Sequence, residues 1–262
     1  MKARLFLKVC GVTVVAFGLA YFCFINSGEV FHSKHFFNSL FVKLSYKDYQ
    51  DTTALKGVTK VIVHAENADV ELKPAHNPEG HITLTTGVNM EHALHVERKG
   101  DTLIVNLANL EPYSNSELTI RLPDALTEIE VQDQQGDVIL EKLTATHVTL
   151  ATVGGDLKLK EDKIITAKLS SVNGDIKIHA DIQQADIKSV SGDIKFDVTS
   201  STPRYEINSV NGDIHITIPS SLATLISAQT INGDITGLDN KARANQPYYI
   251  HTKSVNGDIT IN

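Results

Sequence analysis

The stretch Ser171-Val172-Asn173-Gly174-Asp175-Ile176 decides the fold, because close copies of it recur through the second half of this 262-residue chain. Seven copies centre on Gly-Asp pairs: Gly136-Asp137, Gly155-Asp156, Gly174-Asp175, Gly192-Asp193, Gly212-Asp213, Gly233-Asp234 and Gly257-Asp258. Successive glycines lie 19, 19, 18, 20, 21 and 24 residues apart. A nearly fixed period of this length is typical of stacked supersecondary units. We therefore interpret the pairs as structural repeat turns rather than as seven active sites.

Two strands flank each Gly-Asp pair. In the copy around Asp175, Leu169 and Ser171 share one alternating set of positions, whereas Val172 and Ile176 belong to the other. Alternation with period two predicts strands with one buried face. Because the alternation changes between Ser171 and Val172, we expect the chain to turn there.

Two all-β architectures fit this pattern. In a β-hairpin the Asn-Gly sequence makes the turn, and the Val residues point away from the core. In a right-handed β-solenoid, similar to a β-helix, every coil stacks on the last. The Val column is then buried, the glycines sit where a side chain would clash, and the aspartates form an outward ladder. The regular period and the burial of the Val column favour the solenoid, with eight or nine coils at ~4.8 Å per layer and a length of about 40 Å.

The aspartate ladder has a structural and a functional interpretation. The structural one is that each carboxylate accepts turn N–H groups beside its own Asn. The alternative is a row that binds cations, since calcium-binding β-rolls use Gly- and Asp-rich repeats. Residues two positions after successive aspartates are expected to neutralise the ladder in part; they are Lys158, Lys177, Lys195 and His215.

The charge and hydropathy pattern of residues 1–27 predicts a targeting segment. They carry Lys2, Arg4 and Lys8 before a long uncharged apolar run, which favours an uncleaved signal anchor with the following chain exported. A cleaved signal peptide is the alternative, and the remainder would then be secreted. Both cysteines, Cys10 and Cys23, lie in this segment, so we expect no disulfide in the exported part.

The rest of the chain divides into a connector and a β domain. Residues 28–56 form an aromatic-rich juxtamembrane connector, whose apolar spacing over residues 37–44 predicts a helix on the bilayer or on the end of the β domain. Residues 57–262 form one β-strand-repeat domain, degenerate over 57–125 and regular over 126–262. Within the degenerate part, Asn67-Ala68-Asp69-Val70 looks like a decayed copy of the repeat with Ala in place of Gly.

Charge and motifs narrow the function. The net charge is −7, and residues 1–27 contribute three positive charges and no negative one, so the remainder carries −10. Such an acidic domain is a poor nucleic-acid binder. His92 and His95 form an H-x-x-H, but in a strand they would face opposite sides. We expect no metal, no cofactor and no catalytic residue, and the sequence does not determine the oligomeric state.

A family resemblance adds to this interpretation. The run Glu117–Leu126, then Ile129-Glu130-Val131, and then the serial S-V-N-G-D-I copies resemble the bacterial β-strand-repeat family of unknown function whose members carry the label "putative adhesin". The resemblance covers roughly residues 57–262. It implies a solenoid-like domain in the cell envelope, and it brings no catalytic residues.

Three functions remain open. The first is a non-catalytic, membrane-anchored cell-envelope module that acts as an adhesin-like binder or scaffold for an envelope protein or surface polymer, in the periplasm or at the cell surface. The second is an envelope-stress accessory protein that binds cationic peptides through its acidic face. The third is a carbohydrate-active β-helix enzyme, which would need convergent carboxylates in a cleft.

Overall fold

The computed structural model describes residues 47–51, 55–75, 80–86, 94–107, 116–123, 125–222, 225–237 and 248–262. All regular structure in these ranges is β, as predicted. They contain no helix long and apolar enough to cross a bilayer. The predicted targeting segment 1–27 and the helix predicted over residues 37–44 lie outside the described residues. The described ranges belong to one compact unit, Tyr46–Asn262.

The strands, in chain order, are β1 (Lys47–Asp51), β2 (Lys60–Ala65), β3 (Ala68–Pro74), β4 (His81–Thr86), β5 (Leu94–Lys99), β6 (Thr102–Leu107), β7 (Ser116–Leu122), β8 (Ala125–Asp133), β9 (Val138–Glu141), β10 (Thr144–Thr152), β11 (Leu157–Ser171), β12 (Ile176–Ser189), β13 (Ile194–Val198), β14 (Arg204–Ser209), β15 (Ile214–Thr217), β16 (Leu225–Thr230), β17 (Ile235–Thr236), β18 (Tyr249–Ser254) and β19 (Ile259–Ile261). Strand β1 falls within the predicted connector and pairs antiparallel with β4.

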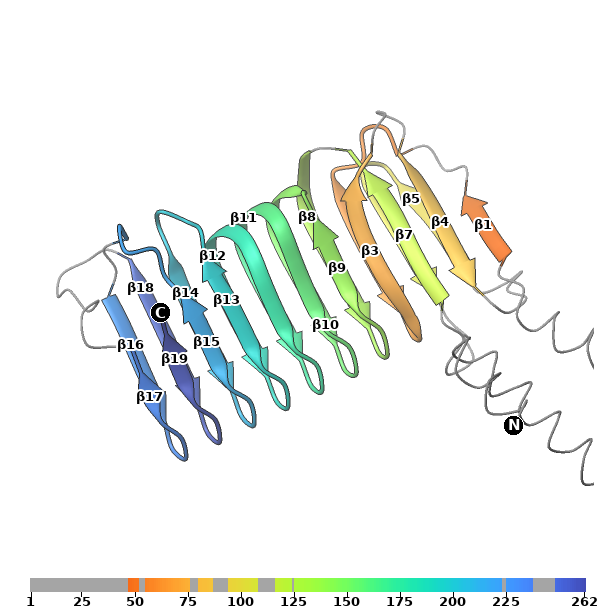
Figure 1. Cartoon of the computed structure of the whole chain (residues 1–262). Coiled ribbons are helices and arrows are strands. Elements are labelled where there is room, and N and C mark those ends of the chain that lie inside the picture. The colour runs from red at the N-terminus through yellow and green to blue at the C-terminus, as the bar shows by residue number, and fades with distance from the viewer. Residues whose placement is uncertain are drawn as a thin grey trace, which may run out of the picture. The chain divides into compact units, whose positions relative to one another are not determined.

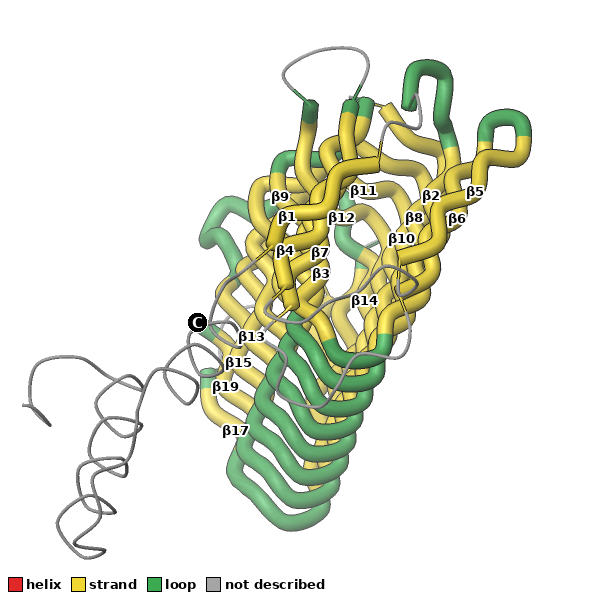
Figure 2. The backbone as a smooth tube through the Cα atoms, turned by 90° about the vertical axis from the view of Figure 1, so that its right-hand side faces the viewer, coloured by secondary structure: helices red, strands yellow, loops and turns green. Residues whose placement is uncertain are grey.

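The strands stack as parallel coils around one core (Figures 1 and 2). Each coil places one strand on each of two faces. Face A runs in the order β6, β2, β8, β10, 163–171 of β11, 182–189 of β12, β14, β18 and β16. Face B runs in the order β7, β3, β9, 157–160 of β11, 176–180 of β12, β13, β15, β19 and β17. The described strands other than β1, β4 and β5 therefore form nine coils, one for each member of a face.

Register follows the sequence repeat. Ile187 lies beside Leu169 on one side and Ile207 on the other, so equivalent positions of successive repeats stack in columns. These pairings are parallel, whereas a hairpin would join neighbouring strands in antiparallel fashion. The solenoid-like interpretation is thus confirmed for the described repeats, and the hairpin alternative is wrong.

The coils do not stack in chain order at either end. The 102–122 coil is the outermost at one end, and the 60–74 coil lies between it and the 125–141 coil. At the other end the 249–261 coil lies between the 204–217 coil and the 225–236 coil. The first and last coils of the described chain are therefore each held between two neighbours.

The core is a set of aliphatic columns with few aromatic side chains. Tyr205 and Phe196 are fully buried and stack at a ring-centroid distance of 4.6 Å. The Tyr205 hydroxyl donates a hydrogen bond to the Ile182 carbonyl at 2.5 Å. The burial of this ring needs that hydrogen bond, because an unpaired hydroxyl in an apolar interior is costly.

The Val column is exposed, which corrects the prediction that a solenoid would bury it. Five of its six members are exposed: Val153 44%, Val172 38%, Val190 43%, Val210 40% and Ile231 74%. The sixth, Val255, is half-buried. The turn begins at this position, so its side chain points outward. The preceding small polar residue is buried in its place, as Ser171 and Ser189 show at 3% exposure each.

Candidate functional site

The seven Gly-Asp pairs come together on one edge of the stack, where each coil turns from face A to face B. Their glycines form a column in which backbones touch. A Cβ built on Gly155 would lie 1.8 Å from the carbonyl oxygen of Gly136, and one on Gly174 would lie 1.9 Å from that of Gly155. None of the seven is among the residues with positive φ. The glycines are required by close approach of backbones, as the solenoid interpretation predicted.

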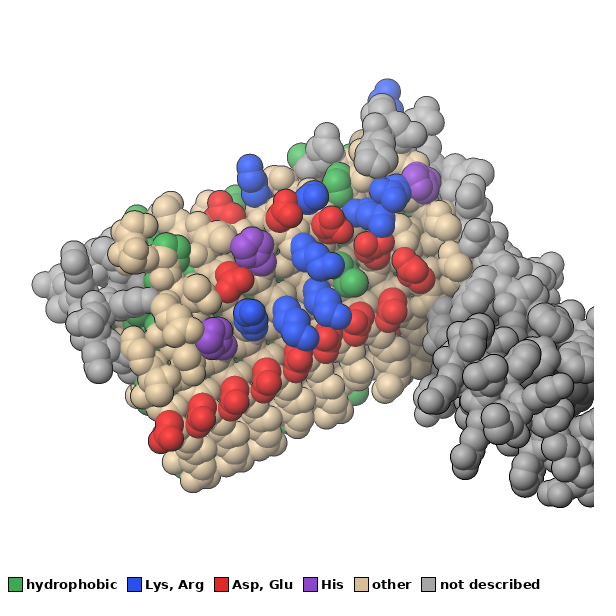
Figure 3. All heavy atoms as spheres, in the orientation of Figure 1, with side chains coloured by type: hydrophobic (Ala, Val, Ile, Leu, Met, Phe, Trp, Pro, Cys, Tyr) green, Lys and Arg blue, Asp and Glu red, His purple; other side chains and the backbone are tan. Residues whose placement is uncertain are grey.

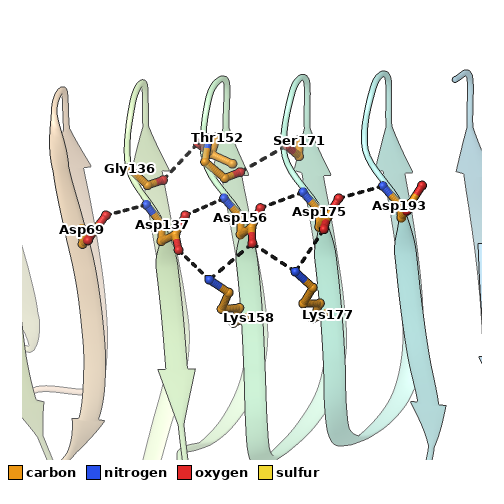
Figure 4. Close-up of polar contacts among 11 residues, drawn as sticks. Asp69, Gly136, Asp137, Thr152, Asp156, Lys158, Ser171, Asp175, Lys177 and Asp193 are labelled. Carbon is orange, nitrogen blue, oxygen red and sulfur yellow. Dashed lines mark hydrogen bonds and ion pairs between the residues drawn. The ribbon is translucent and has the colours of Figure 1, made fainter. Parts of the chain in front are cut away.

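The aspartates form a hydrogen-bonded ladder beside the glycines (Figure 4). The backbone N–H of Asp156 donates to the Asp137 carboxylate at 2.9 Å, and the N–H of Asp175 donates to Asp156 at 2.9 Å. The same link joins Asp137 to Asp69, Asp193 to Asp175, Asp213 to Asp193, Asp258 to Asp213 and Asp234 to Asp258. Every ladder carboxylate before that of Asp234 therefore binds the adjacent coil, which corrects the prediction that it would bind its own turn.

The ladder confirms that residues 67–70 are a decayed repeat. Asp69 accepts the Asp137 N–H at 2.9 Å, so it begins this run of linked aspartates. Ala68 can replace Gly here because Gly136 supplies the close approach: a Cβ on Gly136 would lie 2.1 Å from the Ala68 carbonyl oxygen. Ala68 contributes only its carbonyl oxygen to this contact, so it tolerates a Cβ. Gly136 does not, because its own Cβ would meet that oxygen.

Two lysines neutralise one half of the ladder. Lys158 Nζ lies 2.5 Å from Asp137 and 3.3 Å from Asp156, and Lys177 Nζ lies 3.2 Å from Asp156 and 3.0 Å from Asp175. Partial burial by itself would raise the pKa of Asp156, but the Asp175 N–H and the two lysines outweigh it and hold that pKa below its usual value. The hydrogen bond to Asp175 raises the pKa of Lys177.

The other half of the ladder carries unpaired charge. Asp193, Asp213, Asp258 and Asp234 are exposed, and within the described ranges none of them forms an ion pair. Lys195 and His215, which we expected to neutralise this part, do not contact it; His215 Nε2 instead lies 3.0 Å from Asn262 Nδ2. Figure 3 shows the acidic side chains in one row with lysines beside only part of it.

Asparagines and apolar residues run parallel to this unpaired half. Asn256 Nδ2 donates to Asn211 Oδ1 at 2.7 Å, and Asn232 Nδ2 donates to Asn256 Oδ1 at 2.8 Å. The exposed Val column lies one residue before them in each turn. In the coils of Asp213, Asp258 and Asp234 the edge thus presents an apolar, an amide and a carboxylate position, with a spacing of ~4.8 Å between coils. The Asp193 coil has Ser191 at the amide position.

Two buried carboxyls were not predicted. Asp133 takes the place that Ser and Thr hold in other coils, and burial raises its pKa to about 6. Asp162 accepts hydrogen bonds from the N–H groups of Leu143 (2.8 Å) and Lys160 (2.9 Å) at the opposite corner, and burial raises its pKa to about 7. One partner, Lys160, lies two residues away in the same corner, whereas the other, Leu143, lies on the neighbouring coil, and the local sequence of Asp162 does not reveal that second contact.

No cluster of three or more His, Cys, Asp or Glu side chains in the described part of the chain has the geometry to hold a metal ion. The ladder aspartates stack in single file, so each carboxylate meets backbone rather than converging with others on one point. Of the H-x-x-H pair, His92 lies outside the described residues and His95 is exposed on β5.

Solved structures of similar fold come from bacteria. A "putative adhesin" of Bacteroides fragilis matches at 15% identity and a TM-score of 0.54, with 83% of this chain and 97% of that chain covered. A "putative adhesin" of Parabacteroides distasonis gives 12% identity and a TM-score of 0.49, with 84% and 98% covered. A "putative lipid binding protein" of the same species gives 14% and 0.47, with 83% and 97% covered. A comparison with curated proteins found no match.

A family model covers nearly the whole chain. The Toastrack DUF4097 model matches residues 27–262, which include every coil and all seven Gly-Asp pairs. The match confirms the resemblance seen in the serial S-V-N-G-D-I copies, and the family's function is unknown. The chain belongs to the Toastrack DUF4097 family.

Proposed function

We propose that this chain is a non-catalytic binding or scaffold module of a bacterial cell envelope, with an adhesin-like role. The observation that carries the proposal is the periodic edge, where Asp side chains repeat in a straight column, with Val or Ile beside them in six of the seven Gly-Asp copies and Asn in four. Such a surface offers the same contacts at a fixed step. It complements a ligand that is itself extended or repetitive, such as a surface polymer or an extended segment of an envelope protein.

The location is part of the same proposal. Residues 1–27 would anchor the chain in the membrane and residues 46–262 would be exported, because basic residues precede the apolar run. Cleavage of that run would release a secreted form. We also propose that the coils wind in the right-handed sense, since parallel crossover connections nearly always do.

In-cell crosslinking of the full-length chain, followed by mass spectrometry, tests this proposal. We expect the chain to crosslink reproducibly to an envelope protein or to surface polymer. Substitution of Val172 and Val190 by Ser, which changes the exposed column without touching the core, should weaken the crosslink. Val148→Ala, inside the core, is the control for general loss of stability. A crosslinking pattern that the column variants leave unchanged would contradict the periodic edge as the binding surface.

A second candidate function is the binding of cationic peptides. The specific observation in its favour is the run of four exposed carboxylates without a lysine partner among the described residues, from Asp193 to Asp234. Asp193→Asn with Asp213→Asn removes two charges but keeps an oxygen acceptor for the ladder hydrogen bonds. Binding of a cationic peptide should fall with added salt and fall further in this variant. Glu130→Gln with Glu206→Gln, on face A, is the charge-matched control, and equal effects of both pairs would contradict this function.

A further inference from the structure

The outermost coil at one end of the stack has strand edges that are paired on one side only. In the part of the chain that the structure describes, β16 pairs only with β18, and β17 pairs only with β19. Both edges therefore present backbone N–H and C=O groups away from the stack. An unpaired edge of this kind is a template for another strand.

Among the described residues, this end lacks the protection that the other end has. At the opposite end, the antiparallel strands β4 and β5 cover β7 and β6. Strand β5 also carries three charged residues, Glu97, Arg98 and Lys99. Natural proteins use such charges and covering segments to prevent edge pairing. By contrast, β16 reads LISAQT and β17 reads IT, without charge or Pro.

Apolar side chains are exposed on this same coil. Leu225 is 40% exposed, Ile235 is 37% exposed and Ile231 is 74% exposed. Of these, Ile235 owes its exposure to the end position, because Ile259, its partner one coil further in, is fully buried. Leu225 does not, since its partner Tyr249 is 46% exposed. At Ile235 the apolar surface of the 225–236 coil is thus part of a coil interface that has no described coil against it.

We propose that this end binds the same end of a second copy of the chain. A two-fold axis perpendicular to both faces would place β16 antiparallel to the partner's β16 and β17 antiparallel to the partner's β17. A single extended peptide can pair with one of these edges, whereas a second copy presents both at the matching spacing. Head-to-tail stacking is blocked, because the opposite end is covered by antiparallel strands. The absence of charge on both strands means that identical edges do not repel.

Site-specific crosslinking of the full-length chain tests the proposal. In a Cys10→Ser, Cys23→Ser background, Ser227→Cys places a thiol near the middle of β16, and a short bismaleimide should join two chains. Thr149→Cys, exposed on face A in the middle of the stack, is the control for crowding in the membrane. We expect a crosslinked dimer from Ser227→Cys and none from Thr149→Cys.

A charge on the edge provides an independent readout. Leu225→Lys changes an exposed side chain, so the chain should keep its fold and its thermal unfolding while the Ser227→Cys dimer is lost. A dimer that survives Leu225→Lys would overturn the proposal. So would a Ser227→Cys chain that stays uncrosslinked or that crosslinks only to another protein.

Discussion

The backbone N–H of Asp213 donates a hydrogen bond to the carboxylate of Asp193 at 2.9 Å, across 20 residues of sequence. Repeated from Asp69 to Asp234, this link makes the carboxylate of one coil the cap for the turn of the next. Like charges stacked at ~5 Å repel one another. The hydrogen bond of each carboxylate must therefore stabilise the fold by more than this repulsion destabilises it. The balance between these two effects can be measured at the positions that have no lysine.

Asp213→Asn should leave stability unchanged or slightly higher. The Asn side-chain oxygen can still accept the Asp258 N–H, which lies 2.8 Å from Asp213, while the repulsion between neighbours is relieved. Asp213→Ala removes the acceptor and should cost about 1–2 kcal/mol. The measurement is urea unfolding of residues 46–262 followed by circular dichroism. If the Asn variant loses as much stability as the Ala variant, the charge and not the acceptor holds the turns.

Gly155→Ala should prevent the coils from stacking, whereas Gly154→Ala should be tolerated. The Cβ added at position 155 would meet backbone atoms of Gly136, which cannot move without opening the stack, and we expect a loss of at least about 3 kcal/mol. At position 154 the Cβ meets only the end of the Gln135 side chain, 2.8 Å away. That side chain can rotate, so the change should stay within about 1 kcal/mol. Thermal unfolding of the two adjacent variants checks the contrast.

Much of this turn could be predicted from the sequence, because the repeat itself carries the constraint. A Gly that recurs at a fixed period in a stack predicts close approach, and Asp beside it predicts a ladder. The prediction that the Val172 side chain points into the core was wrong for a geometric reason. Alternation showed that the turn lies between Ser171 and Val172 but not which of the two stays inside. The tight corner beside the Gly155 carbonyl admits a small residue, and Ser171 Oγ contacts that oxygen at 3.4 Å.

The order of the coils could not be predicted from the repeat. The motif around Asp258 is nearly identical to that around Asp213 and Asp234, so any of these coils could stack on another in the same register. The chosen order depends on the connections between coils, which have no repeating pattern. Asp162 is a similar case, because one of the two N–H groups that it binds, that of Leu143, belongs to the corner of a different coil and carries no sequence signal.

The stability of the domain should fall as the pH rises from about 4 to about 7. Burial raises the pKa of Asp133 to about 6 and that of Asp162 to about 7, from an ordinary value of 3.8. Between these values the folded chain holds protons that the unfolded chain has released, so raising the pH favours unfolding, by on the order of 3 kcal/mol for Asp162. Below pH about 4 the opposite holds for Asp156, whose lowered pKa stabilises the fold only while it is ionised.

Asp133→Ser isolates one of these two groups. Serine is the residue that other coils carry at this position, as at Ser171 and Ser189, so the variant should fit and should be more stable than the natural chain at pH 8. Its stability should also depend less on pH between 4 and 6. Urea unfolding at several pH values measures both effects, with the exposed Glu206→Gln as the control. An unchanged pH profile would mean that Asp133 is ionised in the folded chain.

The inverted coil order predicts an inverted order of hydrogen exchange. The amides of β18 and β19 are near the end of the described chain, where fraying is usual, but they lie between two coils. Those of β16 and β17 come earlier in sequence and lie at the edge of the stack. In dilute protein carrying Leu225→Lys, which we expect to prevent pairing of two chains, β18 should exchange more slowly than β16, because opening β18 requires both neighbouring interfaces to separate. Faster exchange in β18 than in β16 would show that the last coil is not held between its neighbours.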